Sequence, residues 1–333
     1  MAVQITIIGL GQVGASMGLA LAKIKDQVVR IGNDRDPDVA RKAERTGAID
    51  KFVINLPSAV EKADVVILAV PADEVRETIE VIAQDLKPGV VLIDTSPVKG
   101  PVMAWAKELL PGEDRYFAAL TPGFNPAYLL EAYGGIDHAH ADLFEKSLML
   151  VSTQSGIDDS AVELVTRLIA VFGATPLFAD TYEADGLTAY SHTLPNLLAA
   201  AMVNATIDQP GWREARKMAG PAYAQVTGPV EQFDETQKLG TAALLNAENT
   251  VRMLDNLMDA LAQLRDALAE KDEAALHERL AHARDGREMW LQERSTGNWE
   301  KRAGSDQHMP TSGETIGRLF GGKMFGGQQK KDK

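Results

Sequence analysis

A strand, a glycine-rich turn and a helix open the chain, and this unit constrains the fold more than any other feature. Residues 3–8 (VQITII) form a short apolar run rich in β-branched side chains, as expected of a strand buried on both faces. Gly9, Gly11 and Gly14 follow in the spacing G-x-G-x-x-G. The first allows a tight turn, the second lets the backbone approach a pyrophosphate, and the third lets the helix pack on the strand. The N–H groups at the start of that helix would face the phosphates.

An acidic residue after the second strand indicates which dinucleotide this turn would bind. Residues 28–31 form that strand, and Asp34 lies 20 residues beyond Gly14 (34 minus 14). A carboxylate there accepts hydrogen bonds from the adenosine ribose and repels a 2′-phosphate, so we expect NAD as the cofactor. Arg35 keeps NADP possible, because its guanidinium could pair with a 2′-phosphate.

Strands and helices alternate along the first half of the chain. Apolar strands are expected at 65–70, 90–93, 147–153 and 174–178, and helices at 37–47, 76–86 and 160–172. This order predicts a Rossmann-type α/β fold, a doubly wound, mostly parallel sheet whose ligand lies beyond the carboxyl ends of the strands. The residues expected to contact the cofactor are Gly9, Leu10, Gly11, Gln12, Val13, Gly14, Asp34, Arg35, Val70, Pro71 and Thr95.

The pattern becomes helical near residue 181. Segments 187–205 and 239–268 are apolar at helical spacing and poor in strand formers, and Pro195 kinks or starts the first helix. A helix as long as the second commonly packs on its copy in another subunit, which predicts a homodimer. We therefore expect a dinucleotide-binding domain over residues 1–180, an all-helical substrate and dimerisation domain over 181–296, and a flexible tail over 297–333.

Composition argues against several classes of partner. The net charge is −13 and the basic residues are scattered among acids, which argues against nucleic acid. There is no cysteine, so disulfides and thiolate chemistry are excluded, and no metal site is expected. No apolar run is long enough to span a bilayer, and the N-terminus enters the first strand without a secretory leader. The sequence therefore predicts a cytoplasmic protein that acts on a small molecule, without a membrane partner.

Seven segments in a fixed order resemble the prephenate and arogenate dehydrogenase family. They are GLGQVGASMGLAL, ADVVILAVP, DTSPVK, HADLFEKSLMLVS, VFGATP, SHTLPNLLAAAM and LLNAENTVRMLDNLMDAL, and they cover roughly residues 3–295. The resemblance implies an oxidative decarboxylation in tyrosine biosynthesis. In that reaction, hydride leaves C4 of a cyclohexadienyl ring for the nicotinamide, a base takes the C4 hydroxyl proton, and carbon dioxide departs as the ring aromatises. The substrate would be a small carboxylic acid.

Four polar positions depart from the family pattern. Pro97 stands at the serine of D-x-G-S-V-K, with a hydroxyl one place earlier at Ser96, and Thr121 stands at the histidine of H-P-x-x-G, the family's usual base. Aligning LPN with the end of S-H-L-P-H places Asn196 at the second histidine and leaves His192 one residue out of register. The arginine of the family's T-R-I-A has no match. Either the substrate has changed, the chemistry has been rebuilt, or the protein is no longer a dehydrogenase.

Four residues near the expected crevice are candidates for the catalytic groups. His192 is the best base, since an ordinary imidazole has a pKa of about 6.5, although a helical histidine among apolar neighbours can also be a core residue. Thr121 is not a base at neutral pH but can hydrogen-bond the substrate hydroxyl. Lys99 matches a family lysine and would hold either a substrate carboxylate or its own loop, the alternative being a surface lysine at the start of a helix. Ser96 either belongs to the site or caps the helix expected near residue 98.

Four further residues are expected to contact the substrate. Asn125 and Asn196 are neutral donors for a carbonyl or hydroxyl, and His138 and His140 lie in a loop that could carry a base to the nicotinamide or could be inert. Three hypotheses follow from the sequence. They are an NAD(P)-dependent dehydrogenase of prephenate or arogenate, a related oxidoreductase acting on another small acid, and a nucleotide-binding homologue without catalysis.

Overall fold

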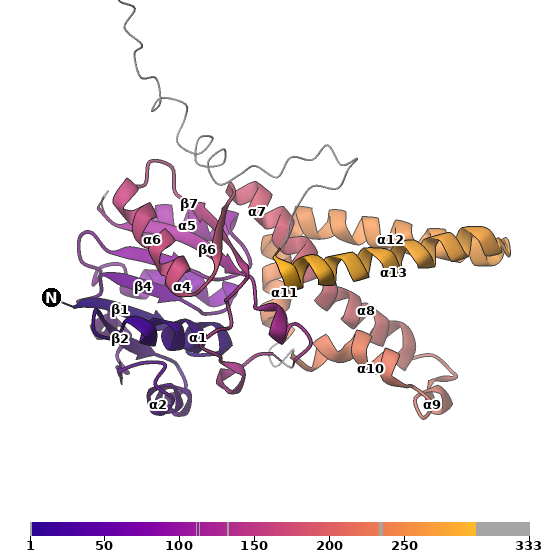
Figure 1. Ribbon diagram of the computed structural model, residues 1–333, viewed down its shortest axis with the longest axis horizontal. Coiled ribbons are helices and arrows are strands. Elements are labelled where there is room, and N and C mark those ends of the chain that lie inside the picture. Colours follow the sequence, from indigo (N-terminus) through magenta and orange to yellow (C-terminus); the bar gives the residue numbers. More distant parts are fainter. Residues whose placement is uncertain (1, 111, 113, 132, 233–235, 298–333) are drawn as a thin grey trace, which may run out of the picture.

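The computed structural model describes residues 2–297, except 111, 113, 132 and 233–235. Figure 1 shows a sheet with helices on its faces and a helical region that projects from one end of the sheet. The strands are β1 (Val3–Ile8), β2 (Val28–Asn33), β3 (Lys51–Phe52), β4 (Val65–Leu68), β5 (Val91–Asp94), β6 (Tyr116–Pro122), β7 (Leu148–Thr153) and β8 (Thr175–Phe178). The helices that accompany them are α1 (Gln12–Leu21), α2 (Pro37–Arg45), α3 (Leu56–Val60), α4 (Ala72–Ile82), α5 (Gly100–Leu109) and α6 (Asp159–Val171).

The strand order confirms the predicted mostly parallel, doubly wound sheet. The order is β3-β2-β1-β4-β5-β6-β7-β8, and β6 and β7 are its one antiparallel pair of neighbours in the described chain. The described part of segment 123–147 contains two short 3₁₀ turns and no crossover helix, so the chain re-enters the sheet from the edge at which β6 ends. β6 was not among the predicted strands. Thr121, expected in a loop, lies near the end of this strand.

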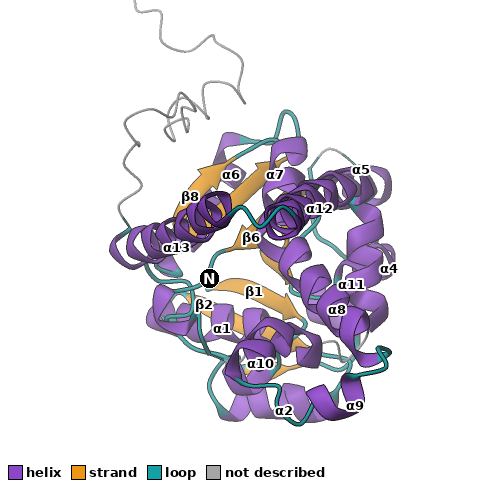
Figure 2. Ribbon diagram, turned by 90° about the vertical axis from the view of Figure 1, so that its right-hand side faces the viewer, coloured by secondary structure: helices purple, strands orange, loops and turns teal. Residues whose placement is uncertain are grey.

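Alternate strand residues build a separate apolar core on each face of the sheet. Val65 and Ile67 pack on the face covered by α1, α2 and α6, whereas Val66 and Leu68 pack on the face covered by α4 and α5 (Figure 2). β4 and β5 are buried along their whole length, because helices cover both faces. The carboxyl ends of the parallel strands therefore meet at one edge, which faces the helical region.

The helical region differs from the two long helices that the sequence predicts. Its elements are α7 (Thr181–Thr188), a π turn (Ala189–Thr193), α8 (Leu194–Ile207), α9 (Trp212–Ala215), α10 (Pro221–Thr227), α11 (Thr236–Leu245), α12 (Ala247–Ala269) and α13 (Glu273–Thr296). The predicted helix over 239–268 is broken at Asn246, whose side chain donates to the carbonyl of Asp185 at 2.7 Å instead of facing solvent. α12 and α13 lie side by side and project away from the sheet (Figure 1).

Two predictions concern the C-terminal tail and the absence of membrane-spanning helices. The tail predicted over 297–333 lies outside the described residues, apart from Gly297. In the described part of the chain, no helix combines the length and apolar character needed to cross a membrane.

Candidate active site

The three glycines after β1 have different structural roles. Gly9 has a φ of +86°, and a Cβ there would lie 2.4 Å from the carbonyl oxygen of Ala69. A Cβ at Gly14 would lie 2.0 Å from the carbonyl oxygen of Gly9, so Gly14 lets α1 pack on the turn, whereas Gly9 lets the turn approach the chain after β4. A Cβ at Gly11 would meet no atom within 4 Å. The open side at Gly11, before the first N–H groups of α1, is where a diphosphate could approach the backbone.

Asp34 lies directly beside the glycine turn. Its Oδ2 accepts from the backbone N–H of Leu10 at 2.7 Å, and its Oδ1 accepts from the N–H of Asp36 at 2.8 Å. The carboxylate is thereby held at the end of β2 in the position expected for a ribose acceptor. The adjacent Arg35 contacts the first turn of α4, where its Nη1 donates to Oε1 of Glu74 at 2.9 Å.

A loop from residue 133 to 140 is attached to the glycine turn. The side chain of Gln12 accepts from the N–H of Gly134 at 2.9 Å and donates to the carbonyl of His138 at 3.0 Å, and the N–H of His140 donates to Ser16 at 3.0 Å. The ring of His140 stacks on Tyr128 with centroids 4.2 Å apart. Neither predicted loop histidine is among the described residues that line the cavity at the strand ends.

Asn125 also shapes this part of the chain. Its Oδ1 accepts from the N–H of Ala127 at 3.1 Å, and its Nδ2 donates to the carbonyl of Asp142 at 3.1 Å. The side chain is buried and both of its polar atoms have protein partners. Asn125 is therefore not among the described residues that line the cavity, and its amide holds the loop.

A cavity of about 320 Å³ lies between the carboxyl edge of the sheet and the helical region. Its lining residues are Val13, Pro71, Ala72, Thr95, Pro97, Thr121, Pro122, Phe124, His192, Thr193, Asn196, Lys238, Leu239 and Ala242. The sequence singled out six of them, from both halves of the chain: Val13, Pro71, Thr95, Thr121, His192 and Asn196. A space of this size, apolar with a few polar groups, suits a small ring-containing ligand.

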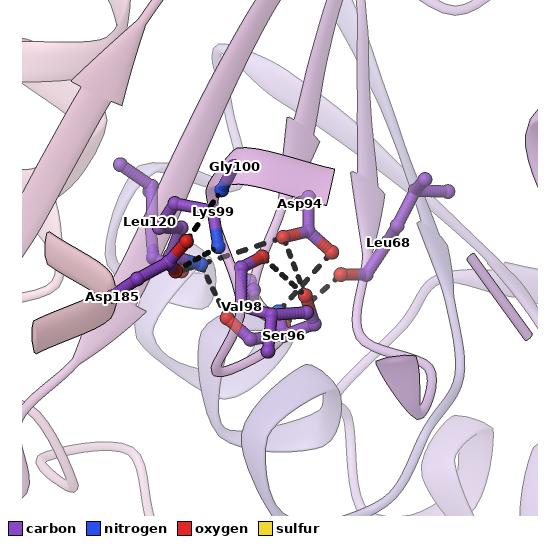
Figure 3. A network of polar contacts seen from close by, with 9 residues as sticks. Leu68, Asp94, Ser96, Val98, Lys99, Gly100, Leu120 and Asp185 are labelled. Atoms are coloured by element: carbon purple, nitrogen blue, oxygen red, sulfur yellow. Dashed lines mark hydrogen bonds and ion pairs between the residues drawn. The ribbon is translucent and has the colours of Figure 1, made fainter. Parts of the chain in front are cut away.

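Lys99 is fully buried and is not among the residues that line this cavity, and Figure 3 shows its polar contacts. Its Nζ donates to the carbonyl oxygens of Leu120, at 2.6 Å, and of Ser96, and it lies 3.4 Å from Oδ2 of Asp94. An ammonium group has three protons, so these three partners account for all of them. Of the two roles predicted for Lys99, the contacts favour holding its own loop over binding a substrate carboxylate. The bond to Leu120 also sets the backbone immediately before Thr121.

Asp185 of α7 joins the helical region to the start of α5. Its two carboxylate oxygens accept from the backbone N–H groups of Lys99, at 2.5 Å, and of Gly100, at 2.9 Å (Figure 3). Ser96, one of whose predicted roles was to cap this helix, instead donates to Oδ2 of Asp94 at 2.8 Å, so that role was wrong. The helix begins later than expected, at Gly100, and its capping acid comes from another element.

Burial changes the proton affinities of this network. It raises the pKa of Asp94 and of Asp185 and lowers the pKa of Lys99, because each charged form loses hydration. The opposite charges on Asp94 and Lys99 counteract these shifts. The network is thus a buried ion pair whose members depend on each other.

Thr121 carries the unpaired polar atom of the cavity. Its Oγ1 is buried, and among the described residues it has no hydrogen-bond partner. A buried hydroxyl without a partner costs free energy, so such groups commonly find a partner in water or in a ligand. Thr121 is therefore a residue of the cavity lining whose buried hydroxyl has no hydrogen-bond partner among the described residues.

His192 reaches the cavity from the π turn. The N–H of Leu194 donates to the carbonyl of Ala189, five residues earlier, so the turn contains one residue more than an α-helical turn. The segment S-H-T-L-P-N, in which the resemblance leaves His192 one residue out of register, begins in this turn. His192 lines the cavity.

The neighbours of His192 define which of its nitrogens is free. Ser191 Oγ donates to the carbonyl of Leu187 at 2.9 Å and lies 2.8 Å from Nδ1 of His192. A hydroxyl has one proton, so Ser191 accepts from His192, and Nδ1 carries the imidazole proton. Nε2 then keeps its lone pair. His192 is exposed as a residue, yet loss of hydration beside the surrounding protein, and then the charge of Lys99, lower the pKa of His192 to about 4.

Known proteins resemble both halves of this chain. A sequence model of the family described as "Prephenate dehydrogenase, nucleotide-binding domain" matches residues 17–176. The chain is 27% identical to the prephenate dehydrogenase of Lactococcus lactis subsp. cremoris over 276 residues, which are 82% of this chain and 73% of that protein. It is 22% identical to the cyclohexadienyl dehydrogenase of Zymomonas mobilis over 271 residues, 81% of this chain and 89% of that protein.

Solved structures share the fold. The prephenate dehydrogenase of A. aeolicus, in complex with hydroxyphenyl propionate and NAD+, superposes with a TM-score of 0.75 and 20% identity, over 87% of this chain and 98% of the other. The arogenate dehydrogenase of Synechocystis superposes with a TM-score of 0.67 and 20% identity, over 86% and 99%. These solved structures show the shared fold, and the sequence model shows that residues 17–176 are similar to the nucleotide-binding domain of prephenate dehydrogenases.

Proposed function

We propose that the protein is an NAD-dependent dehydrogenase that oxidises and decarboxylates a cyclohexadienyl acid such as prephenate or arogenate. The observation that carries this proposal is one cavity lined by Thr121, whose hydroxyl has no partner among the described residues, by His192, and by Val13 of the helix that follows the glycine turn. The relatives are named for these activities, and the A. aeolicus relative was crystallised with NAD+.

The residues present fit a bound NAD. The open side of Gly11 and the start of α1 would hold the diphosphate, and Asp34 would accept from the adenosine ribose. Pro71 and Thr95, at the ends of neighbouring strands, would lie beside the nicotinamide. When bound, the nicotinamide supplies the hydride acceptor. A cytoplasmic location stays a prediction.

Four side chains of the protein would each have a different role in binding or deprotonating the substrate. His192 Nε2 would take the proton of the ring hydroxyl, because it is unprotonated at neutral pH and lines the cavity. Thr121 would hydrogen-bond the same hydroxyl and orient it. Lys99 would hold the loop after β5 against β6, through its bonds to the carbonyls of Ser96 and Leu120. The Asn196 side chain, which donates to the carbonyl of His192 at 2.6 Å, would hold the π turn and face the substrate.

Activity with two substrates tests the assignment. Purified protein should reduce NAD+ to NADH when prephenate or arogenate is added. The absorbance of the NADH formed measures the rate. The replacement of the family histidine by Thr121 favours a second candidate, a related dehydrogenase of another small acid. Reduction with a hydroxy or amino acid but with neither cyclohexadienyl acid would support the second candidate. NADH binding without turnover on any acid would support a homologue that has lost catalysis.

The glycine turn gives a separate prediction about cofactor binding. Gly11→Ala should weaken NADH binding by about tenfold or more, because the added methyl occupies the side from which the pyrophosphate approaches. The free energy of unfolding should change by less than about 0.5 kcal/mol, since the methyl meets no protein atom. Fluorescence titration with NADH and urea denaturation measure the two effects. Unchanged NADH affinity in this variant would contradict the assignment of the diphosphate site.

The helical domain proposed over residues 181–296 would also form a homodimer. α8 is predominantly apolar, yet Ala199 is its one buried residue. Large apolar side chains are also exposed on this helix and on the α12–α13 hairpin, among them Leu198, Ile207, Val251, Leu261, Leu268 and Leu280. Exposed apolar surface of this extent is typical of a protein interface. Sedimentation at micromolar concentration should show a dimer.

A further inference from the structure

One carboxylate stands between two cations beside the expected cofactor groove. Glu74 lies in the first turn of α4, and its Oε1 is 2.9 Å from Nη1 of Arg35 and 3.7 Å from Nζ of Lys238. Arg35 follows β2, whereas Lys238 belongs to α11 and lines the cavity. The Glu74 side chain is 30% exposed, less than half the exposure of Arg35 at 62%. Glu74 therefore links the ribose end of the groove to the helical region.

The place of Arg35 makes this contact relevant to the choice of cofactor. Arg35 directly follows Asp34, the residue positioned to accept from the adenosine ribose. An arginine here is the group in the chain best placed to bind a 2′-phosphate, because its planar fork matches phosphate geometry. In the structure its guanidinium is paired instead with the carboxylate of Glu74, in the first turn of α4. The negative charge that Glu74 brings would also repel a phosphate.

We propose that Glu74 is a second residue that determines cofactor specificity, acting with Asp34 to favour NAD over NADP. Asp34 excludes the 2′-phosphate directly, at the ribose. Glu74 acts through Arg35, by neutralising the cation that would otherwise attract that phosphate. The inference rests on the proposed function, since it assumes that this groove binds a nicotinamide dinucleotide.

The test is the binding of NADH and NADPH to Glu74→Gln. Glutamine keeps the size of the side chain but removes its charge, so the ratio of the NADPH Kd to the NADH Kd should fall by about fivefold or more. Glu77→Gln is the matched control, because it removes the same charge from the exposed side of the next turn of α4 and should leave the ratio unchanged. Equal ratios in the two variants would overturn the proposal.

A second variant tests the inference independently of how Glu74→Gln folds. If Glu74 neutralises Arg35, then Arg35→Gln in the otherwise unchanged chain should alter the NADPH Kd by less than about threefold. A loss of tenfold or more would show that Arg35 already binds the 2′-phosphate and would overturn the proposal. Failure of the unchanged protein to bind NADH would count against the proposed function itself. NADH binding with unaltered discrimination in Glu74→Gln would count against Glu74 alone.

Discussion

Replacing His192 by glutamine is expected to lower kcat by about 10²- to 10⁴-fold, the usual contribution of a positioned general base. Glutamine keeps polarity and approximate size but has no lone pair of comparable basicity, so NADH affinity should stay unchanged. Steady-state kinetics with the substrate identified for the unchanged protein, together with NADH titration, measure the two effects. His282→Gln, on the exposed surface of α13, is the control and should retain full activity.

The pH profile provides a second readout of the same group. A base acts only when unprotonated, and the pKa of His192 is lowered to about 4, so kcat/KM should fall as the pH drops through about 4. An imidazole with an ordinary pKa would lose activity near pH 6.5 instead. The glutamine variant should lack the acid limb. Full activity in that variant, or an identical acid limb, would remove His192 from the mechanism.

Replacing Lys99 by methionine is expected to lower the free energy of unfolding by about 3–5 kcal/mol, the usual cost of leaving one member of a buried ion pair without its partner. Asp94, which is fully buried, would lose its counter-ion, and the carbonyls of Ser96 and Leu120 would lose a donor. Urea denaturation measures the change. Lys107→Met, on the exposed side of α5, the helix that follows Lys99, should cost less than about 1 kcal/mol.

The loss of unfolding free energy in Lys99→Met should be larger at neutral pH than at acid pH. Burial raises the pKa of Asp94, and loss of Lys99 removes the charge that opposes this shift. The folded variant would therefore bind a proton more tightly than its unfolded chain, so its stability falls as the pH rises above about 4. The deficit should shrink as the pH is lowered towards that value. Equal stability of the Lys99 and Lys107 variants at neutral pH would show that the ion pair does not hold these loops.

The fold of the first half could be predicted because its signals are local. Each strand is an apolar run ended by a turn residue, and the glycine spacing defines the turn before α1. β6 escaped prediction because its end, Thr121 and Pro122, reads as the start of a loop. The break at Asn246 also escaped, since the apolar period continues across it and the reason for the break is a contact with Asp185, 61 residues away.

The candidate site could be predicted in part for the same reason. Thr121 and His192 stood out through their positions in motifs, and the structure brings both to one cavity. Asp185 was missed, because an acid inside a helical stretch carries no local sign that it accepts from a backbone 86 residues earlier. The partners of Lys99 and Ser96 were likewise set by tertiary packing. Which atoms fill a hydrogen-bond shell is decided by the assembled structure, not by spacing along the chain.

The π turn at residues 189–193 means that the number of residues in this turn determines the direction in which His192 points. Successive residues of an α-helix are rotated by about 100°, so deletion of Thr193 would restore regular winding and swing His192 out of line with the residues that follow it. The sheet and the Asp185 anchor would be untouched. A change of one residue in the length of this turn would therefore reposition His192 without a substitution at His192 itself.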